Sequence, residues 1–318
     1  MDHLPQNVHQ PFFAYGTLKS SELAHRQIES FVTSCSTACL EGYELLVADG
    51  IPRAFPSQGS VVIGELIELD PAGYEKIARY EQTPGRYVWT EAEVNGAMAN
   101  LVVYSSQIET RHDKVERWEA SDDTMLADGM VWALKKLVQI RRFTSSRQTH
   151  RLVDEESKAA FVELQSVYSI LWSVFERLTL FCEGPLLQNE KMGQRIGKIA
   201  GIDAWKSAYE QAGGDRALSV RSSSDPFARP KRPGSFGFEA WYQLRNNVIH
   251  RGKSAGREFS QLLVAAIDMF RTLALFELEQ SESLKKFLEK RLTPAEMNLI
   301  LIGFTPTELS RLEENHAK

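Results

Sequence analysis

The first third of the chain has the pattern of apolar and polar positions that is typical of short strands. Apolar side chains recur at close intervals along Val61–Asp70 and are bounded by glycine, proline and polar clusters. A short helix is expected at Ile77–Glu81, before a turn at Thr83–Gly85. The remaining predicted strands are one that begins at Phe12, then Leu40–Leu46, Tyr87–Val94 and Leu101–Tyr104.

The rest of the chain has helical spacing. Apolar residues at intervals of three and four predict helices over Tyr168–Phe181 and Phe259–Phe276, and a third helix that ends at Gly252. An earlier helical pattern runs through Trp118, Met125, Met130, Trp132, Leu134 and Leu137. Two helix starts are expected at Thr293-Pro294 and Thr305-Pro306. Strands followed by helices predict an α+β protein whose second half is an antiparallel bundle.

Length and charge support two domains. The chain has 318 residues, 43% of them hydrophobic, which is enough to bury two cores. Its net charge of −5 hides an asymmetry, because residues 1–110 hold 6 basic and 14 acidic side chains, whereas residues 221–260 hold 8 basic and 3 acidic ones. We expect a domain for a small molecule joined to one that binds phosphates.

Nothing in the sequence points to a membrane span or a cofactor. The amino terminus is polar, and the apolar stretch 262–276 is interrupted by Asp268 and Arg271, so we expect a cytoplasmic protein with no membrane span. The cysteines (Cys35, Cys39, Cys182) lack the spacing of a zinc site and are expected to be ordinary thiols. With no phosphate-binding or dinucleotide-binding glycine run in the sequence, we expect no cofactor and no metal.

The segment Phe12–Lys19 is the first candidate site. An apolar strand leads directly into Tyr-Gly-Thr-Leu, where Gly16 can adopt dihedrals closed to other residues, so that consecutive N–H groups converge on an anion. Thr17 adds a hydroxyl and Lys19 a positive charge. The alternative is an ordinary glycine turn after an edge strand.

The order of these strands, turns and short helix, from residue 11 to residue 105, resembles the γ-glutamylcyclotransferase-like family. The resemblance implies a small, mostly antiparallel β-barrel, a small γ-glutamyl ligand, and formation of 5-oxoproline by attack of an α-amino group on its own γ-carbonyl. Glu81 matches the family's proton-transferring glutamate, and the amides of Gly16, Thr17 and Leu18 would hold the α-carboxylate. Tyr15 and Tyr104 are candidate pocket walls.

Three positions depart from the pattern of that family, which often has aspartate, glycine and arginine where this chain has Ala78, Gln82 and Trp89. These changes leave the proposed acid-base group in place and alter its surroundings. The alternative for Glu81 is a solvated carboxylate at a helix end with no chemical role.

The second candidate site is the helical motif Arg245-Asn246-Asn247-Val248-Ile249-His250. On a helical bundle this motif resembles the HEPN family, many of whose members are metal-independent endoribonucleases. The resemblance covers residues 156–280. It implies a homodimer through this bundle, with RNA cut at a composite site. His250 would transfer protons, Arg245 would neutralise the phosphorane and Asn246 would orient one of them. RNA contacts are expected at Arg251, Lys253 and Arg232. The alternative is a buried polar clasp without catalysis.

The predicted organisation is therefore a cyclotransferase-like domain with a packing helix at residues 1–143, a linker at 144–155, a HEPN-like bundle at 156–280 and a helical tail at 281–318. Our leading hypothesis is a ribonuclease whose barrel acts as catalyst or ligand sensor, in stress response or phage defence. The second is a working γ-glutamyl or γ-glutamylamine cyclotransferase that the bundle only dimerises. The third is a ligand-responsive interaction protein in which neither domain is catalytic.

Overall fold

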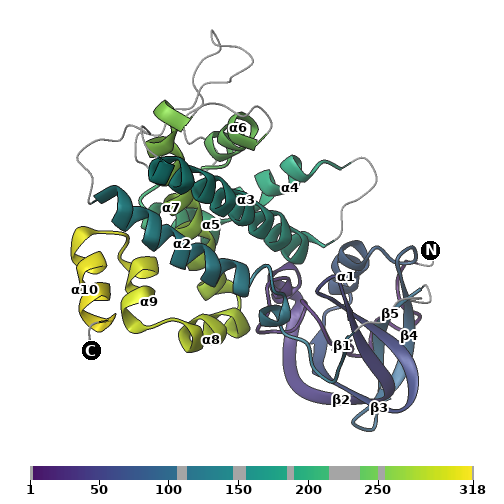
Figure 1. Ribbon diagram of the computed structural model, residues 1–318. Coiled ribbons are helices and arrows are strands. Elements are labelled where there is room, and N and C mark those ends of the chain that lie inside the picture. The colour runs from purple at the N-terminus through teal and green to yellow at the C-terminus, as the bar shows by residue number, and fades with distance from the viewer. Residues whose placement is uncertain are drawn as a thin grey trace. The chain divides into compact units, whose positions relative to one another are not determined.

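The computed structural model describes residues 3–105, 113–145, 155–184, 190–214, 237–249 and 255–316. Its contacts divide the chain into two compact units (Figure 1). The first, called the barrel unit, comprises Met1–Thr124 together with Leu180–Asn189 and Gln280–Ser283. The second, called the helical unit, comprises Met125–Thr179, Glu190–Glu279 and Leu284–Lys318. Each unit is described by itself below.

The barrel unit contains six strands and one α-helix among its described residues. The strands are β1 (Phe12–Ala14), β2 (Val32–Ala48), β3 (Ile51–Leu69), β4 (Tyr87–Val94), β5 (Ala97–Tyr104) and β6 (Asp113–Val115). The helix is α1 (Gly73–Glu81), and short 3₁₀ turns are η1 (His25–Gln27), η2 (Glu29–Phe31) and η3 (Ala120–Asp122).

Five strands form a closed barrel. The sheet order is β3-β1-β5-β4-β2, and β2 also pairs with β3, so the ring closes, while β6 pairs with β2. The β2–β3 and β4–β5 turns have the positive φ angles of tight hairpins, at Asp49-Gly50 (54° and 71°) and Asn95-Gly96 (51° and 83°). Closure leaves the five barrel strands without an open edge. The expected small barrel is therefore confirmed. The strand predicted at Tyr87–Val94 has those bounds as β4, whereas β2, β3 and β5 are longer than the sequence patterns predicted.

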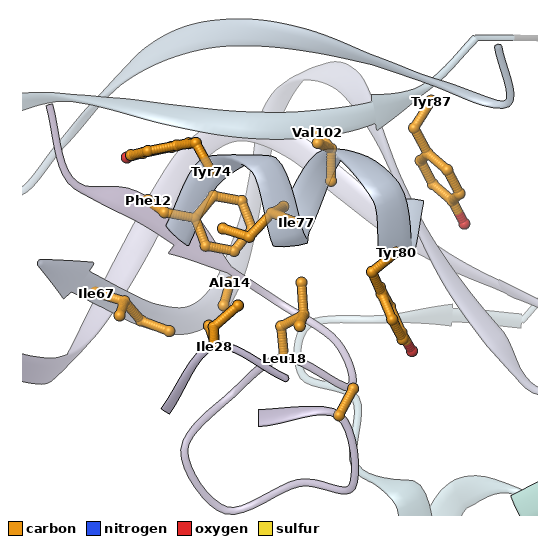
Figure 2. Close-up of a cluster of buried hydrophobic side chains, with 11 residues drawn as sticks. Phe12, Ala14, Leu18, Ile28, Ile67, Tyr74, Ile77, Tyr80, Tyr87 and Val102 are labelled. Atoms are coloured by element: carbon orange, nitrogen blue, oxygen red, sulfur yellow. The ribbon is translucent and has the colours of Figure 1, made fainter. Parts of the chain in front are cut away.

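The barrel core is built from inward-facing residues of the strands and from one face of α1. Tyr74, Ile77 and Tyr80 of α1 lie against Phe12 and Val102 in a single buried cluster (Figure 2). This spacing of three residues places all three side chains on the same side of the helix. Burial of that face fixes the end of α1, where Glu81 lies, over the barrel.

Gly64 of β3 has no room for a side chain. A Cβ atom there would lie 2.4 Å from the carbonyl oxygen of Ala14 and 2.7 Å from the ring of Phe13. We expect Gly64→Ala to lower the free energy of unfolding by about 1–3 kcal/mol, since backbone cannot move aside cheaply. In denaturant titrations, the control Gly197→Ala, in a helix with open space around it, should raise it by about 0.5–1 kcal/mol. Equal stability of Gly64→Ala and the parent protein would contradict this packing.

The helical unit contains nine helices in its described part. They are α2 (Asp128–Ser145), α3 (Glu155–Glu183), α4 (Met192–Ala200), α5 (Asp203–Gln211), α6 (Phe238–Ile249), α7 (Ala255–Gln280), α8 (Glu282–Arg291), α9 (Pro294–Leu301) and α10 (Pro306–His316). The last residues of α3 and α7 and the first of α8 belong to the barrel unit. The helix starts expected at residues 293 and 305 are confirmed, and the Thr293 side chain accepts the N–H of Glu296 as an N-cap.

Aromatic side chains fill the core of the helical unit. The rings of Phe175 and Trp205 stack with centroids 4.7 Å apart, and Trp241 meets both at an edge. The Tyr168 hydroxyl donates to the Trp241 carbonyl, which ties α3 to α6. The segment Phe259–Gln280 has the length and composition of a membrane span, yet 83% of its most apolar window is buried within the protein.

The helix α2 begins later than the sequence pattern suggested, and it belongs to the helical unit instead of the barrel unit. Trp118 precedes it, in the barrel unit, whereas α2 itself belongs to the helical unit. A Cβ atom at Gly129 would lie 3.5 Å from Val174 and 3.7 Å from Ile170, so α2 packs closely on α3. From the sequence we expected this helix to pack on the barrel. An amphipathic pattern does not show which of two cores the apolar face of a helix covers.

Candidate active site

The loop that follows β1 presents three backbone N–H groups with no hydrogen-bond partner among the residues that the structure describes. These are the amides of Gly16, Thr17 and Leu18. The loop is held in place by its other groups, since Lys19 N donates to the Gly16 carbonyl and Ala24 N to the Thr17 carbonyl. Unpaired N–H groups in a mostly buried loop are suited to an anion, because leaving them unsatisfied costs free energy.

Thr17 is connected to α1 by a pair of hydroxyl groups. Its Oγ1 lies 2.7 Å from the hydroxyl of Tyr80, which itself donates to the carbonyl of Phe181 at 2.8 Å. Because the Tyr80 proton is used on Phe181, the Thr17 hydroxyl must be the donor to Tyr80. Both lone pairs of Thr17 Oγ1 therefore stay available to accept, for example from a substrate ammonium.

Lys19 has a different environment from the one expected. Its side chain is buried, and its Nζ donates to the carbonyl of Trp118. Desolvation lowers the pKa of Lys19, and the nearby Glu22 carboxylate works in the opposite direction. The ammonium thus fastens the loop to the segment before η3, and the loop amides remain as the groups that could bind an anion.

Glu81 ends α1 beside this loop. Part of the residue is accessible to solvent, but its carboxyl group is densely surrounded by protein, and this desolvation raises its pKa to about 8, with Arg86 partly opposing the shift. The negative charge of Glu81 in turn contributes to the raised pKa values of Tyr15, Tyr80 and Tyr87, after the larger effect of their burial. The carboxyl group therefore lies among three tyrosines at one end of the barrel.

The expected wall residues gather at the same end. Tyr15 donates its hydroxyl proton to the Val102 carbonyl at 2.8 Å, and Tyr87 meets Tyr104 edge to face, with centroids 5.5 Å apart. Tyr80, in the last turn of α1, and Tyr87 lie at the same end of the core cluster (Figure 2). The loop, the carboxyl group and the aromatic walls predicted from sequence thus come from separate elements and meet at one place.

The three departures from the family pattern lie at the edge of this site or outside it. Trp89 packs against Phe12 and Tyr74 and donates its indole N–H to the carbonyl of His3. Ala78 is buried in α1, and Gln82 adopts the left-handed conformation that ends the helix. At the position where the family often has a charged arginine, this chain therefore has an apolar ring that packs in the core.

Two residues that contact the tyrosines of this site could not be expected from the sequence. Arg53 of β3 lies over the ring of Tyr104, with its Cζ 4.3 Å from the ring centroid. Phe181, which accepts from Tyr80, is far along the chain, at the end of α3. No motif or spacing marks either residue, because both are brought here by tertiary packing.

The second candidate site is described only in part. Arg245 lies on α6, with its Cζ 5.4 Å from the Trp172 ring centroid and one Nη 4.0 Å from a carboxylate oxygen of Glu176. Asn246 is half-buried, and its neighbour Asn247 is buried and accepts from Gln243. His250, Arg251, Lys253 and Arg232 lie outside the described residues. The expected meeting of Arg245 with His250 therefore stays a prediction.

No cluster of three or more histidine, cysteine, aspartate or glutamate side chains that could hold a metal ion is present within the described ranges. Cys35 and Cys39 are exposed free thiols, and Cys182 is a buried one.

Comparison with known proteins supports the assignment of the barrel unit. Residues 12–122 match the family model described as gamma-glutamyl cyclotransferase, AIG2-like. The amino-terminal part of this chain is thus a γ-glutamyl cyclotransferase-like domain of the AIG2 type, as the sequence resemblance indicated. The match ends before the helical unit, whose HEPN identity rests on its sequence motif alone.

Solved structures give a weaker likeness over about a third of the chain. A protein from Pyrococcus horikoshii called PH0828 is 20% identical, with 34% of this chain and 89% of that chain covered and a TM-score of 0.29. An AIG2-like protein from Mus musculus is 23% identical, with 35% and 88% covered and a TM-score of 0.30. YkqA from Bacillus subtilis is 19% identical, with 35% and 40% covered and a TM-score of 0.28. The comparison with curated proteins finds no match.

Proposed function

We propose that the barrel unit is an enzyme that converts γ-glutamyl compounds into 5-oxoproline and a free amine. The observation that carries the proposal is the position of Glu81, a carboxyl group with a pKa of about 8, at the end of the barrel where the loop amides of Gly16, Thr17 and Leu18 are unpaired. A proton shuttle with a pKa near neutrality and a fixed anion site are the two things that this cyclisation requires.

In this mechanism the loop amides hold the substrate α-carboxylate, and the Thr17 hydroxyl accepts from the adjacent ammonium. Glu81 removes a proton from that ammonium, and the free amine attacks the γ-carbonyl carbon. A new C–N bond closes the five-membered ring, and the original amide C–N bond breaks. Glu81 then returns its proton to the departing nitrogen. The second proton of the ring nitrogen also passes to the released amine, which leaves as an ammonium, so the enzyme ends the cycle in the state in which it began.

The raised pKa suits both steps. A carboxylate with a pKa near 8 is a much stronger base than an ordinary glutamate, and in its protonated form it is still acidic enough to protonate the departing nitrogen. Burial is the main cause of that shift, and Tyr15, Tyr80 and Tyr87 lie close enough to Glu81 for its charge to raise their own pKa values. The test is to incubate the purified full chain with γ-glutamyl amino acids and γ-glutamyl amines and to quantify 5-oxoproline by chromatography. Absence of product with every substrate would remove the proposal.

We propose ribonuclease action of the helical unit as a second function, supported by the Arg245–His250 motif and by the basic stretch 221–260. In this proposal two copies of the chain pair through their bundles, so that two histidines share the two proton transfers. The contacts of Arg245 with Trp172 and Glu176 fit the alternative of a structural clasp as well. Cleavage of total RNA by the full chain, lost in His250→Ala without loss of the dimer, separates the two; cleavage that persists in His250→Ala rules out this mechanism.

A further inference from the structure

Arg53 is a buried cation with no acidic partner among the described residues. The residue is 9% exposed, and its guanidinium forms no hydrogen bond or ion pair with the residues that the structure describes. Its Nε is enclosed by protein and has no acceptor. Burying a charge in this way costs free energy, and native proteins usually pair such groups or use them. The contact with the Tyr104 ring recovers only a part of that cost.

The position of Arg53 connects it to the candidate active site. It follows Pro52, which lies 3.0 Å from where a Cβ of Gly16 would be, so this part of β3 runs beside the loop. The charge of Arg53 also influences Tyr87. Arg53, Tyr104, Tyr87 and Glu81 therefore form a continuous row along one end of the barrel.

The site therefore holds two groups that can bind an anion. The loop amides are assigned to the substrate α-carboxylate, next to the amine that must lose a proton. Arg53, which is connected to Glu81 through Tyr104 and Tyr87, is then left for an anion on the departing amine. The planar guanidinium group presents its outer nitrogens as a fork, which matches the two oxygens of a carboxylate.

We propose that Arg53 binds a carboxylate on the departing amine, so that the substrates are γ-glutamyl amino acids rather than uncharged γ-glutamyl amines. The inference rests on the proposed cyclotransferase function and specifies its substrate class. Arg53 is a specificity-determining residue in this scheme, and it takes no part in proton transfer.

The test compares two ligands that differ only in the carboxylate, γ-glutamyl-alanine and γ-glutamyl-ethylamide. Binding is measured by calorimetry on the full chain carrying Glu81→Gln, in which the proton shuttle is removed and the ligand persists. Adding Arg53→Gln should weaken the affinity for γ-glutamyl-alanine by about 10- to 100-fold, as expected for loss of a charged, bidentate interaction. Binding of γ-glutamyl-ethylamide should change by less than about twofold.

Two further variants serve as controls. Arg79→Gln removes an exposed arginine of α1 and should leave both affinities unchanged, whereas Arg53→Lys keeps the charge without the fork and should fall between the parent and Arg53→Gln. Circular dichroism checks that each variant folds. If Arg53→Gln misfolds, the comparison is made with Arg53→Lys, which should weaken γ-glutamyl-alanine alone.

Several results would overturn the inference. Arg53→Gln could weaken the affinity for both ligands equally or leave both affinities unchanged, or the Glu81→Gln protein could fail to bind γ-glutamyl-alanine. Failure of the proposed function gives a different result, namely that the unsubstituted chain releases no 5-oxoproline from either compound while the selective effect of Arg53 on binding remains. The binding measurement needs no turnover, so the two failures can be told apart.

Discussion

Replacing Glu81 with glutamine should lower the rate of 5-oxoproline release by about 10²- to 10⁴-fold, the range expected when a positioned acid-base group is lost. Glutamine has nearly the same shape and can still pack beside Tyr80, but it cannot take a proton from the substrate ammonium. Because the loop amides of Gly16, Thr17 and Leu18 are unchanged, we expect the Michaelis constant to vary little, so that the loss is found in kcat.

A matched substitution on the same domain controls for the loss of one negative charge. Glu91 lies on β4 and is exposed, so Glu91→Gln should retain the activity of the parent protein. If Glu81→Gln keeps more than about a tenth of the parent rate, the carboxyl group is not the proton shuttle. Equal losses in both variants would point to a general effect of charge.

The pH dependence gives a second measurement of the same group. Since the pKa of Glu81 is raised to about 8, the base form is scarce at low pH and kcat/KM should rise up to that value. At pH 6 the rate should be roughly a hundredfold below its maximum. A rising limb near pH 4.5, the ordinary range of a glutamate, would show that the carboxyl group is solvated in the working enzyme.

Local signals were sufficient to locate the strands and the loop. The Tyr-Gly-Thr-Leu sequence after Phe12 and the glutamate after Tyr80 both lie at the site, because each is next to an element whose pattern is clear. Two further signals were available but unused, the Asp49-Gly50 and Asn95-Gly96 pairs that form the tight hairpin turns. They would have joined the predicted strands into the long β2–β3 hairpin and fixed the β4–β5 pair.

Tertiary packing decided the rest. A strand pattern cannot show that Arg53 lies on Tyr104, nor that Tyr80 reaches the carbonyl of Phe181, a residue 101 positions further along the chain. The same limitation explains why the sequence did not show that α2 belongs to the helical unit, since its apolar face could cover either core. Lys19 illustrates the converse case, since its charge in an anion loop suggested a ligand contact, while the fold gives it a backbone carbonyl.

The second large effect concerns stability, and its direction depends on pH. A buried carboxyl group whose pKa rises from 4.5 to about 8 on folding holds its proton more tightly in the folded state. Its contribution to stability is therefore fully present below pH 4.5 and is lost progressively as the pH rises toward 8. Above pH 8 the folded protein must hold a desolvated carboxylate, which disfavours folding.

Glu81→Gln should consequently be more stable than the parent protein at pH 8.5, by about 2–4 kcal/mol, and nearly equal to it at pH 4.5. We place the value below the full effect of the shift, because part of Glu81 is accessible to solvent. The measurement is the free energy of unfolding of both proteins at the two pH values, with Glu91→Gln as the control whose difference from the parent should not depend on pH. A Glu81→Gln protein that is less stable at pH 8.5 would mean that the carboxylate is stabilised in the fold, and such a group would be too weak a base for the proposed proton transfer. If Glu81→Gln is inactive and its stability relative to the parent protein increases as the pH rises, the result would instead show that the desolvated carboxyl group lowers the stability of the barrel and is kept because catalysis needs it.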